Sequence, residues 1–143
     1  MAEIEIVEIT DAADREAAFA IRRHVFCGEQ RVDPALEFDG LDASCRQYLA
    51  FRNGRPIGTA RLRETGPGAV KIERVAVLAV ERRRGVGAAL MVRAIEDARA
   101  AGARQIAIHA QCHAEHFYAG LGFRTVGGVF DEAGIPHVRM ELD

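Results

Sequence analysis

Residues 82–88 read Arg82-Arg83-Arg84-Gly85-Val86-Gly87-Ala88, a basic turn that contains two glycines. The run before it, residues 71–79, has the composition of a strand, and the run after it, residues 86–100, has the apolar spacing of a helix. Glycine lets the backbone approach a ligand closely, and the N–H groups at a helix N-terminus favour an anion. The arginines add charge and planar donor groups. The segment therefore predicts a phosphate-binding turn between a strand and a helix.

Two other interpretations of this turn stay open from these residues alone. Its glycines are also typical of a tight turn that needs them for geometry, and its arginines of a nucleic-acid patch. The spacing matches neither the P-loop nor the dinucleotide fingerprint. The formal net charge of −2 argues against a nucleic-acid partner held by bulk electrostatics.

Length and composition predict one domain over residues 1–143. Hydrophobic residues make up 49% of the chain, enough for a sizeable core, yet no apolar run approaches the roughly 18 residues of a membrane span. The N-terminus is acidic and alternating, unlike a signal peptide, and the cysteines number three. We expect reduced thiols, a cytoplasmic location and no membrane partner.

The order of elements predicts an α/β fold. Strands are expected at residues 3–10, 45–52, 56–63, 70–80, 105–110, 123–126 and 137–142, and helices at residues 11–28, 86–100 and 113–121. Turns are expected at Asn53-Gly54, Gly66-Pro67-Gly68, Gly127-Gly128 and Gly134-Ile135-Pro136, and a loop at residues 31–44. This order indicates a mixed sheet with helices on both faces.

Two motifs in this order resemble those of the GNAT acetyltransferase superfamily. Arg82-x-x-Gly85-x-Gly87 is similar to the Arg/Gln-x-x-Gly-x-Gly/Ala signature, and residues 117–123, Phe-Tyr-Ala-Gly-Leu-Gly-Phe, resemble the later Phe-Tyr-x-x-x-Gly-Phe motif. The resemblance implies the acetyltransferase fold, with a mostly antiparallel central sheet, over essentially the whole chain. It also implies that residues 82–88 hold the pyrophosphate of acetyl-coenzyme A (acetyl-CoA). The implied contacts to the pantetheine arm come from backbone at Val75, Ala76 and Val77.

Other segments resemble the ElaA-like branch of that superfamily. They are residues 22–30 (Arg-Arg-His-Val-Phe-Cys-Gly-Glu-Gln), residues 37–42 (Glu-Phe-Asp-Gly-Leu-Asp) and residues 134–137 (Gly-Ile-Pro-His). The resemblance fixes the cosubstrate and leaves the acceptor amine and the acyl length unnamed.

Acetyl transfer to an amine calls for a proton acceptor. An alkylamine with a pKa near 10.4 is protonated at pH 7, and freeing its lone pair costs about 4.6 kcal/mol. Glu73 lies on the strand that should flank the thioester, where the family often places a base. His113 and Glu29 are the competing candidates, and Glu73 could instead be a solvated strand side chain.

The resemblance makes Tyr118 the candidate acid for the departing thiolate and a contact to the cofactor. A phenol with a pKa near 10 would protonate a thiolate whose acid has a pKa near 8.5 at a cost of about 2 kcal/mol. Tyr118 is therefore expected to donate a strong hydrogen bond, or to have a lowered pKa, or to be a packed helix tyrosine without a catalytic role.

The run His109-x-x-Cys112-His113-x-x-His116 has the spacing of metal ligands, but a strand followed by a helix would not converge these side chains. We expect no metal and no acyl-enzyme on Cys112. The acidic residues of the 31–44 loop, Asp33, Glu37, Asp39 and Asp42, are interpreted as solvated, with an anionic rim that gathers a cationic amine as the alternative.

These observations predict an acetyl-CoA-dependent N-acetyltransferase that acts by direct attack in a ternary complex. The acceptor is expected to be a primary amine of a small molecule or a peptide, and the oligomeric state is open, with a homodimer a common outcome in the family. The alternative is a non-catalytic acyl-CoA sensor on the same fold. A small nucleic-acid-binding domain is disfavoured by the net charge.

Overall fold

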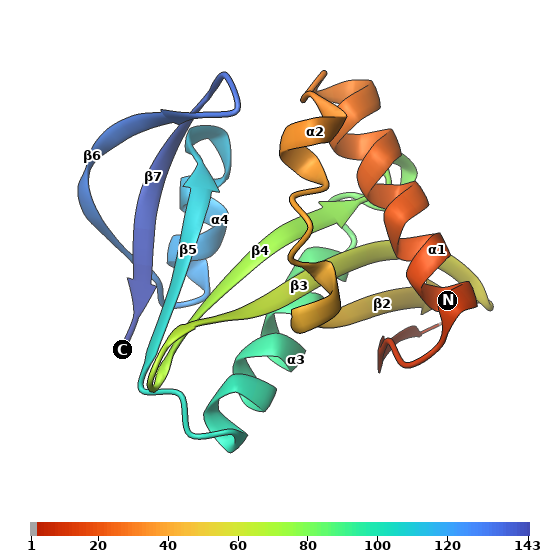
Figure 1. The fold of residues 1–143 in the computed structure, drawn as a ribbon, viewed down its shortest axis with the longest axis horizontal. Helices are drawn as coiled ribbons and strands as arrows, with labels where there is room; N and C mark the ends of the chain where they lie inside the picture. Colours follow the sequence, from red (N-terminus) through yellow and green to blue (C-terminus); the bar gives the residue numbers. More distant parts are fainter. Residues whose placement is uncertain (1–2) are drawn as a thin grey trace.

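A computed structural model describes residues 3–143, which form a seven-stranded sheet flanked by helices (Figure 1). The strands are Ile4–Glu8 (β1), Arg46–Arg52 (β2), Arg55–Gly66 (β3), Ala69–Val77 (β4), Gln105–Gln111 (β5), Arg124–Glu132 (β6) and Ile135–Leu142 (β7). The α-helices are Ala12–Arg22 (α1), Pro34–Glu37 (α2), Val86–Ala100 (α3) and Glu115–Gly120 (α4). No helix in this part of the chain is long and apolar enough to cross a membrane.

The sheet is mixed and mostly antiparallel, with the strand order β1-β2-β3-β4-β5-β7-β6. Its single parallel contact among the described residues joins β4 to β5, where residues 69–71 pair with residues 105–107. Beyond Lys71 and Ala107 the two strands diverge, and Figure 1 shows β5 leaving β4 from a shared narrow end. The sheet is therefore two antiparallel halves held together by one short parallel pairing.

A β-bulge in β4 accompanies this divergence. On β3 the register advances by two residues, from Thr59 to Arg61, while on β4 it covers three, from Ala76 back to Glu73. Arg74 lies in the bulge with a φ of 57°, a left-handed conformation that costs energy for a residue with a side chain. Because a bulge bends and twists its strand, it turns the end of β4 away from β5.

Two apolar cores cover the two faces of the sheet, which confirms the expected helices on both faces. One side of α3 (Val86, Leu90, Met91, Ala94 and Ala98) is buried against the sheet, and Tyr118 of α4 packs on the same core. On the other face, Ala18, Ile21 and Val25 pack against Leu49 and Ala76. The residues of β4 thus alternate between the two cores.

Some predicted turns and loops are wrong. Gly127-Gly128 lies inside β6, where the pairing with β7 is irregular between Val126 and Phe130, so two glycines here mark a bulge instead of a turn. The last turn is shorter than predicted, since β7 begins at Ile135. The first helix continues beyond α1 as a π-helix, Arg23–Glu29 (η1), and residues 31–44 contain α2 and a 3₁₀ turn, Asp42–Ser44 (η2).

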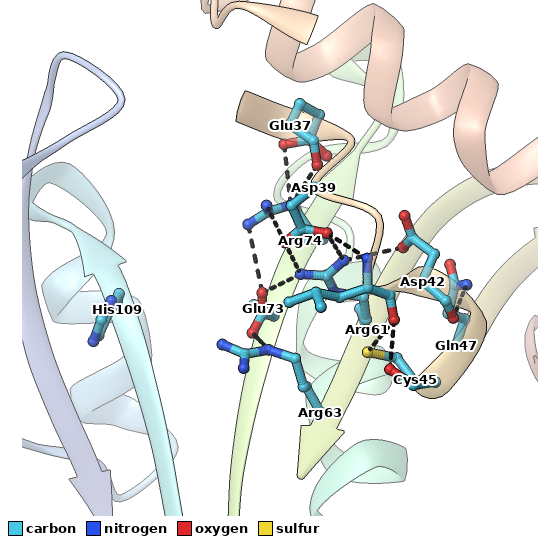
Figure 2. Close-up of polar contacts among 12 residues, drawn as sticks. Glu37, Asp39, Asp42, Cys45, Gln47, Arg61, Arg63, Glu73, Arg74 and His109 are labelled. Carbon is cyan, nitrogen blue, oxygen red and sulfur yellow. Dashed lines mark hydrogen bonds and ion pairs between the residues drawn. The ribbon is translucent and has the colours of Figure 1, made fainter. Parts of the chain in front are cut away.

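Three of the four acidic residues of this segment form ion pairs with buried arginines, so the interpretation as merely solvated side chains is wrong for Glu37, Asp39 and Asp42, although Asp39 itself stays exposed. Figure 2 shows Arg61 of β3 between Asp39, Asp42 and Glu73. The Arg61 side chain is only 1% exposed, and its contacts to the two aspartates are 2.9 and 3.1 Å long. Arg22, equally buried, joins Asp42 at 2.6 Å and Glu37 at 2.7 Å.

These ion pairs hold residues 31–44, the α2 segment, against the sheet. Breaking a buried pair by removing one partner leaves an uncompensated charge and is strongly destabilising. Hydrogen bonds from Arg61 to Asp39 hold the pKa of that carboxyl well below its usual range. The segment that follows η1 is therefore positioned by charge more than by apolar packing.

Gly58 of β3 tests the packing of α3 on the sheet. A Cβ at this position would lie 2.9 Å from Cγ1 of Val86 and 3.2 Å from the backbone oxygen of Ala76. We expect Gly58→Ala to lower the free energy of unfolding by about 1–3 kcal/mol, measured by urea denaturation. Gly66→Ala is the control in the same strand, because nothing lies within 4 Å of its added Cβ. Equal stability of the two variants would contradict this packing.

Asp39 tests the ion-pair network through pH. Its folded-state pKa is lowered, so its stabilising contribution is present above the unfolded pKa of about 3.9 and is lost as the pH falls toward the folded value. We expect Asp39→Asn to be less stable than the wild type at pH 7 by about 1–3 kcal/mol. The difference should shrink below pH 4 in urea titrations. The control is Asp131→Asn, at an exposed position. Its free energy of unfolding should change between pH 7 and pH 3 by the same amount as that of the wild type.

Candidate active site

A cavity of about 690 Å³ opens where β4 and β5 diverge. Its walls come from β4, η1, the α2 segment, β5, the start of α4 and the turn between β6 and β7. Gln30, which follows η1, and Gln111 of β5 exchange two side-chain hydrogen bonds, of 3.3 and 2.8 Å, and so connect two of these walls. The cavity runs from Val77 and Arg82 to Lys71, which lies at the narrow end of the divergence.

The N-terminus of α3 stands beside one end of this cavity. Gly85 caps the helix with a φ of 86°, a left-handed conformation that glycine adopts without strain. No side chain caps the first turn, so its N–H groups remain available to an anion. A Cβ on Gly87 would lie 3.4 Å from Phe117 and 3.9 Å from Val77, and its absence leaves the backbone open between them.

The three arginines of the turn differ in what they contact. Arg82 donates to the backbone oxygen of Val77 at 3.0 Å and pairs with Glu29 at 2.9 Å. Arg84 lies 3.6 Å from Glu81. Arg83 is exposed, has a φ of 62°, and makes no side-chain hydrogen bond or ion pair within residues 3–143. Arg83 is thus the arginine whose side chain a phosphate could engage without displacing a partner.

The predicted pantetheine-binding strand and the predicted acid both line the cavity. Val75, Ala76 and Val77 belong to the part of β4 that has left β5, so that edge has no paired strand in the described chain. Tyr118 packs edge-on against Phe117 and Phe123, with ring centroids 4.9 and 6.1 Å away. Burial raises the pKa of Tyr118 to about 12. Its hydroxyl makes no hydrogen bond to any residue from 3 to 143.

Glu73 lines the cavity but is surrounded by arginines. Its carboxylate contacts Arg61, lies 2.8 Å from Nε of Arg63, and lies 3.5 Å from Arg74 (Figure 2). Burial alone would raise the pKa of Glu73, but the hydrogen bonds and charges of Arg61 and Arg63 outweigh it and hold the pKa below its usual value. Glu73 is consequently a firmly held anion.

The two competing bases lie apart from Glu73. His113 stands in the 3₁₀ turn Cys112–Ala114 (η4) and lines the cavity. Glu29 is paired with Arg82, and that hydrogen bond lowers its pKa. The histidine and cysteine run does not converge: His116 is exposed and does not line the cavity, and residues 3–143 contain no group of three ligands that could hold a metal ion.

One set of side chains in the cavity was not predicted. His109, Glu132, His137 and Lys71 line it from β5, β6, β7 and β4. His109 Nδ1 lies 2.9 Å from a carboxylate oxygen of Glu132, and His137 Nε2 lies 3.6 Å from the other oxygen. The two histidines are visible in the sequence, but the partner that joins them depends on the register of β6 against β7.

Comparisons with known proteins agree with this geometry. The family model described as "Acetyltransferase (GNAT) domain" matches residues 15–143. YyaT of Bacillus subtilis (strain 168) is 37% identical over 140 residues, which are 96% of this chain and 94% of that protein. ElaA of Escherichia coli (strain K12) is 32% identical over 129 residues, covering 87% and 84% of the two chains.

Solved structures share the fold. The crystal structure of Escherichia coli ElaA aligns with a TM-score of 0.86 at 28% identity over the whole of both chains. A GNAT family acetyltransferase from Elizabethkingia anophelis aligns with a TM-score of 0.74 at 17% identity, covering 98% of this chain and 97% of the other. With a family match over nine tenths of its length and these relatives, the chain belongs to the GNAT acetyltransferase family.

Proposed function

We propose that this protein is an N-acetyltransferase that moves the acetyl group of acetyl-CoA to a primary amine. The observation that carries the proposal is the cavity between β4 and β5, which runs from Val77 and Arg82, beside the uncapped N-terminus of α3, to a wall with several titratable side chains. The Elizabethkingia anophelis structure holds bound acetyl-CoA. In this chain the same cosubstrate would place its pyrophosphate at Gly85–Ala88 and its pantetheine arm along Val75–Val77.

Binding of the nucleotide end would supply energy that positions the acetyl group without touching it. The N–H groups of the first turn of α3 would bind the pyrophosphate, and Arg83, which has no partner within residues 3–143, would reach an outer phosphate. Arg82 would position the turn and not bind the phosphate, because its contacts to Val77 and Glu29 connect the turn to β4 and η1.

The chemistry would proceed by direct attack of the amine nitrogen on the thioester carbonyl. A backbone N–H near Val75, on the unpaired edge of β4, would stabilise the oxyanion. With a pKa of about 12, the Tyr118 phenol would protonate a thiolate of pKa near 8.5 only at a cost of about 5 kcal/mol. Tyr118 would therefore act by donating a hydrogen bond to the sulfur as charge develops on it.

Glu73 is less suited to take the proton than its place in the sequence suggests. Moving a proton from an alkylammonium of pKa near 10.4 to a carboxylate of ordinary pKa 4.3 is uphill by about 8 kcal/mol. The arginines around Glu73 lower its pKa further, so the step becomes steeper. As a base Glu73 would have to act through water on an amine that arrives already neutral.

A non-catalytic acyl-CoA sensor is the alternative function. It would bind acetyl-CoA with the same residues and release no thiol with any amine. The two functions are separated by a panel of primary amines (alkylamines, aromatic amines, amino acids and peptides) assayed for thiol release from acetyl-CoA. Thiol release with one of these amines supports the enzyme, and binding without release supports the sensor.

Gly87→Ala tests the cosubstrate site. The added methyl group would stand between Phe117 and Val77 at the end of the cavity, where the proposal places the cosubstrate. We expect the dissociation constant of acetyl-CoA, measured by calorimetry, to rise about tenfold. Val92→Ala, at an exposed position of the same helix, is the control and should bind like the wild type. Unchanged affinity in Gly87→Ala would contradict the placement.

Tyr118→Phe tests the hydrogen bond to the leaving group. We expect kcat for thiol release to fall about 10- to 100-fold, with the affinity for acetyl-CoA within about twofold of the wild type. Because the pKa of Tyr118 is about 12, the wild type should lose no activity from its ionisation up to about pH 10. The control removes the other phenol of the chain: Tyr48→Phe breaks a 2.9 Å bond to Asp97 away from the cavity and should leave kcat unchanged.

A further inference from the structure

His109 and Glu73 stand on opposite sides of the divergence. The last residues that pair between the parallel strands are Lys71 and Ala107, and Glu73 and His109 each lie two positions farther along. Side chains two positions apart on a strand share a face. Figure 2 shows His109 on β5 across from Glu73 and Arg63. A substrate between the two strands on this face would meet both side chains.

The hydrogen bonds of His109 determine which nitrogen faces the substrate. Nδ1 lies 2.9 Å from the Glu132 carboxylate, so in the neutral ring Nδ1 carries the proton and donates it to that oxygen. Nε2 then holds the lone pair, and it makes no hydrogen bond to the chain from residue 3 to residue 143. The ring is 24% exposed, lines the cavity, and packs edge-on against Phe130 at 5.0 Å.

A second histidine lies beside the carboxylate. His137 is buried on β7, and its Nδ1 lies 2.7 Å from the backbone oxygen of Ile135, to which it donates. Its Nε2 lies 3.6 Å from Glu132, and its ring stacks on Phe130. Glu132 is therefore placed between two imidazoles, one of which opens onto the cavity.

We propose that His109, oriented by Glu132, is the general base of this active site. The inference rests on the proposed function and assigns its proton acceptor. As the amine lone pair forms the N–C bond to the acetyl carbon, the C=O electron pair moves to oxygen, and the N–H proton passes to Nε2 of His109. The C–S bond then breaks as the carbonyl re-forms, its electron pair leaves on the sulfur, and the imidazolium returns one proton through solvent to the thiolate. Amide and thiol are the products.

The imidazole fits this task better than the carboxylate across the cavity. An ordinary imidazole, with a pKa near 6.5, holds a proton about a hundredfold more strongly than an ordinary carboxylate, with a pKa near 4.3. Glu73 is also bound by arginines, whereas Nε2 of His109 has no competing bond among the described residues. The charged and titratable groups that face His109 are Glu132 on β6, His137 and Arg139 on β7, Lys71 and Glu73 on β4, and Arg63 on β3.

Lys71 lies at the narrow end of the cavity, two positions before Glu73 on β4. Burial lowers the pKa of Lys71, and the charges of Glu73 and Glu132 only partly oppose that shift. In its charged form Lys71 has three donors and no lone pair to accept a proton. Within residues 3–143 it makes no hydrogen bond, so it remains available to the acceptor or to the oxyanion.

The experiment measures kcat/KM against pH for thiol release, with acetyl-CoA and the best amine of the panel. In His109→Gln we expect a loss of about 100-fold at pH 7. In the wild type and in the variant alike the rate should rise with pH toward the pKa of the amine, because only the neutral amine attacks, so the loss is read at equal pH. In Glu132→Gln we expect kcat/KM to fall about tenfold at pH 7, because the imidazole loses the carboxylate that orients it.

The controls separate this inference from the proposed function. His24→Gln, at an exposed histidine outside the cavity, should keep the wild-type profile, and every variant should bind acetyl-CoA within about twofold of the wild type. Suppose the wild type releases thiol. If His109→Gln then keeps the wild-type profile, or if the loss is found in Glu73→Gln instead, the inference is overturned and the proposed function stands. A wild type that releases no thiol would overturn both. Should His109→Gln fail to fold, Glu132→Gln decides, because this carboxylate side chain is 42% exposed.

Discussion

The separation of β4 from β5 is the constraint on which the active site depends. Two strands of one sheet part only if one of them bends, and the bulge at Arg74 bends β4 at the cost of a left-handed φ. The ion pairs on either side of the bulge offset that cost. Arg61 holds Glu73 from the neighbouring strand, and Arg74 itself lies 3.2 Å from both Glu37 and Asp39 of the α2 segment. The same charges therefore keep the strand bent and the α2 segment in place.

This use of charge has a chemical consequence for Glu73. A carboxylate that three arginines contact is well placed to stabilise a bent strand, and for the same reason it is a weak proton acceptor. The opposite wall carries a different arrangement, in which a carboxylate orients a histidine and leaves one ring nitrogen open. Structural charge and proton transfer are thereby assigned to different strands, so that a change in one need not disturb the other.

The sequence predicted those parts of the fold that local chemistry determines. Asn53-Gly54 marks the hairpin of β2 and β3, and the arginine–glycine turn marks the start of α3, because each depends on the φ values or N–H groups of a few adjacent residues. Gly127-Gly128 has equally strong turn chemistry yet lies within β6, where pairing with β7 overrides it. The ion pairs of Asp39 and Asp42 depend on Arg61, about 20 residues away, and no local pattern reports such a partner.

The two ends of the cavity differ in how they are encoded, because only one of them has a short sequence motif beside it. The end that the proposal assigns to the cosubstrate is made of backbone, namely the N–H groups of α3 and the unpaired edge of β4. A short motif is enough to specify it, because it needs only glycines and the order of strand and helix. The acceptor end is made of side chains from β4, β5, β6 and β7, brought together by register over long separations. A backbone site binds what all members of a family share. A side-chain site can be changed one residue at a time, so under the proposed function the choice of amine would depend on residues such as His109, Glu132 and Lys71.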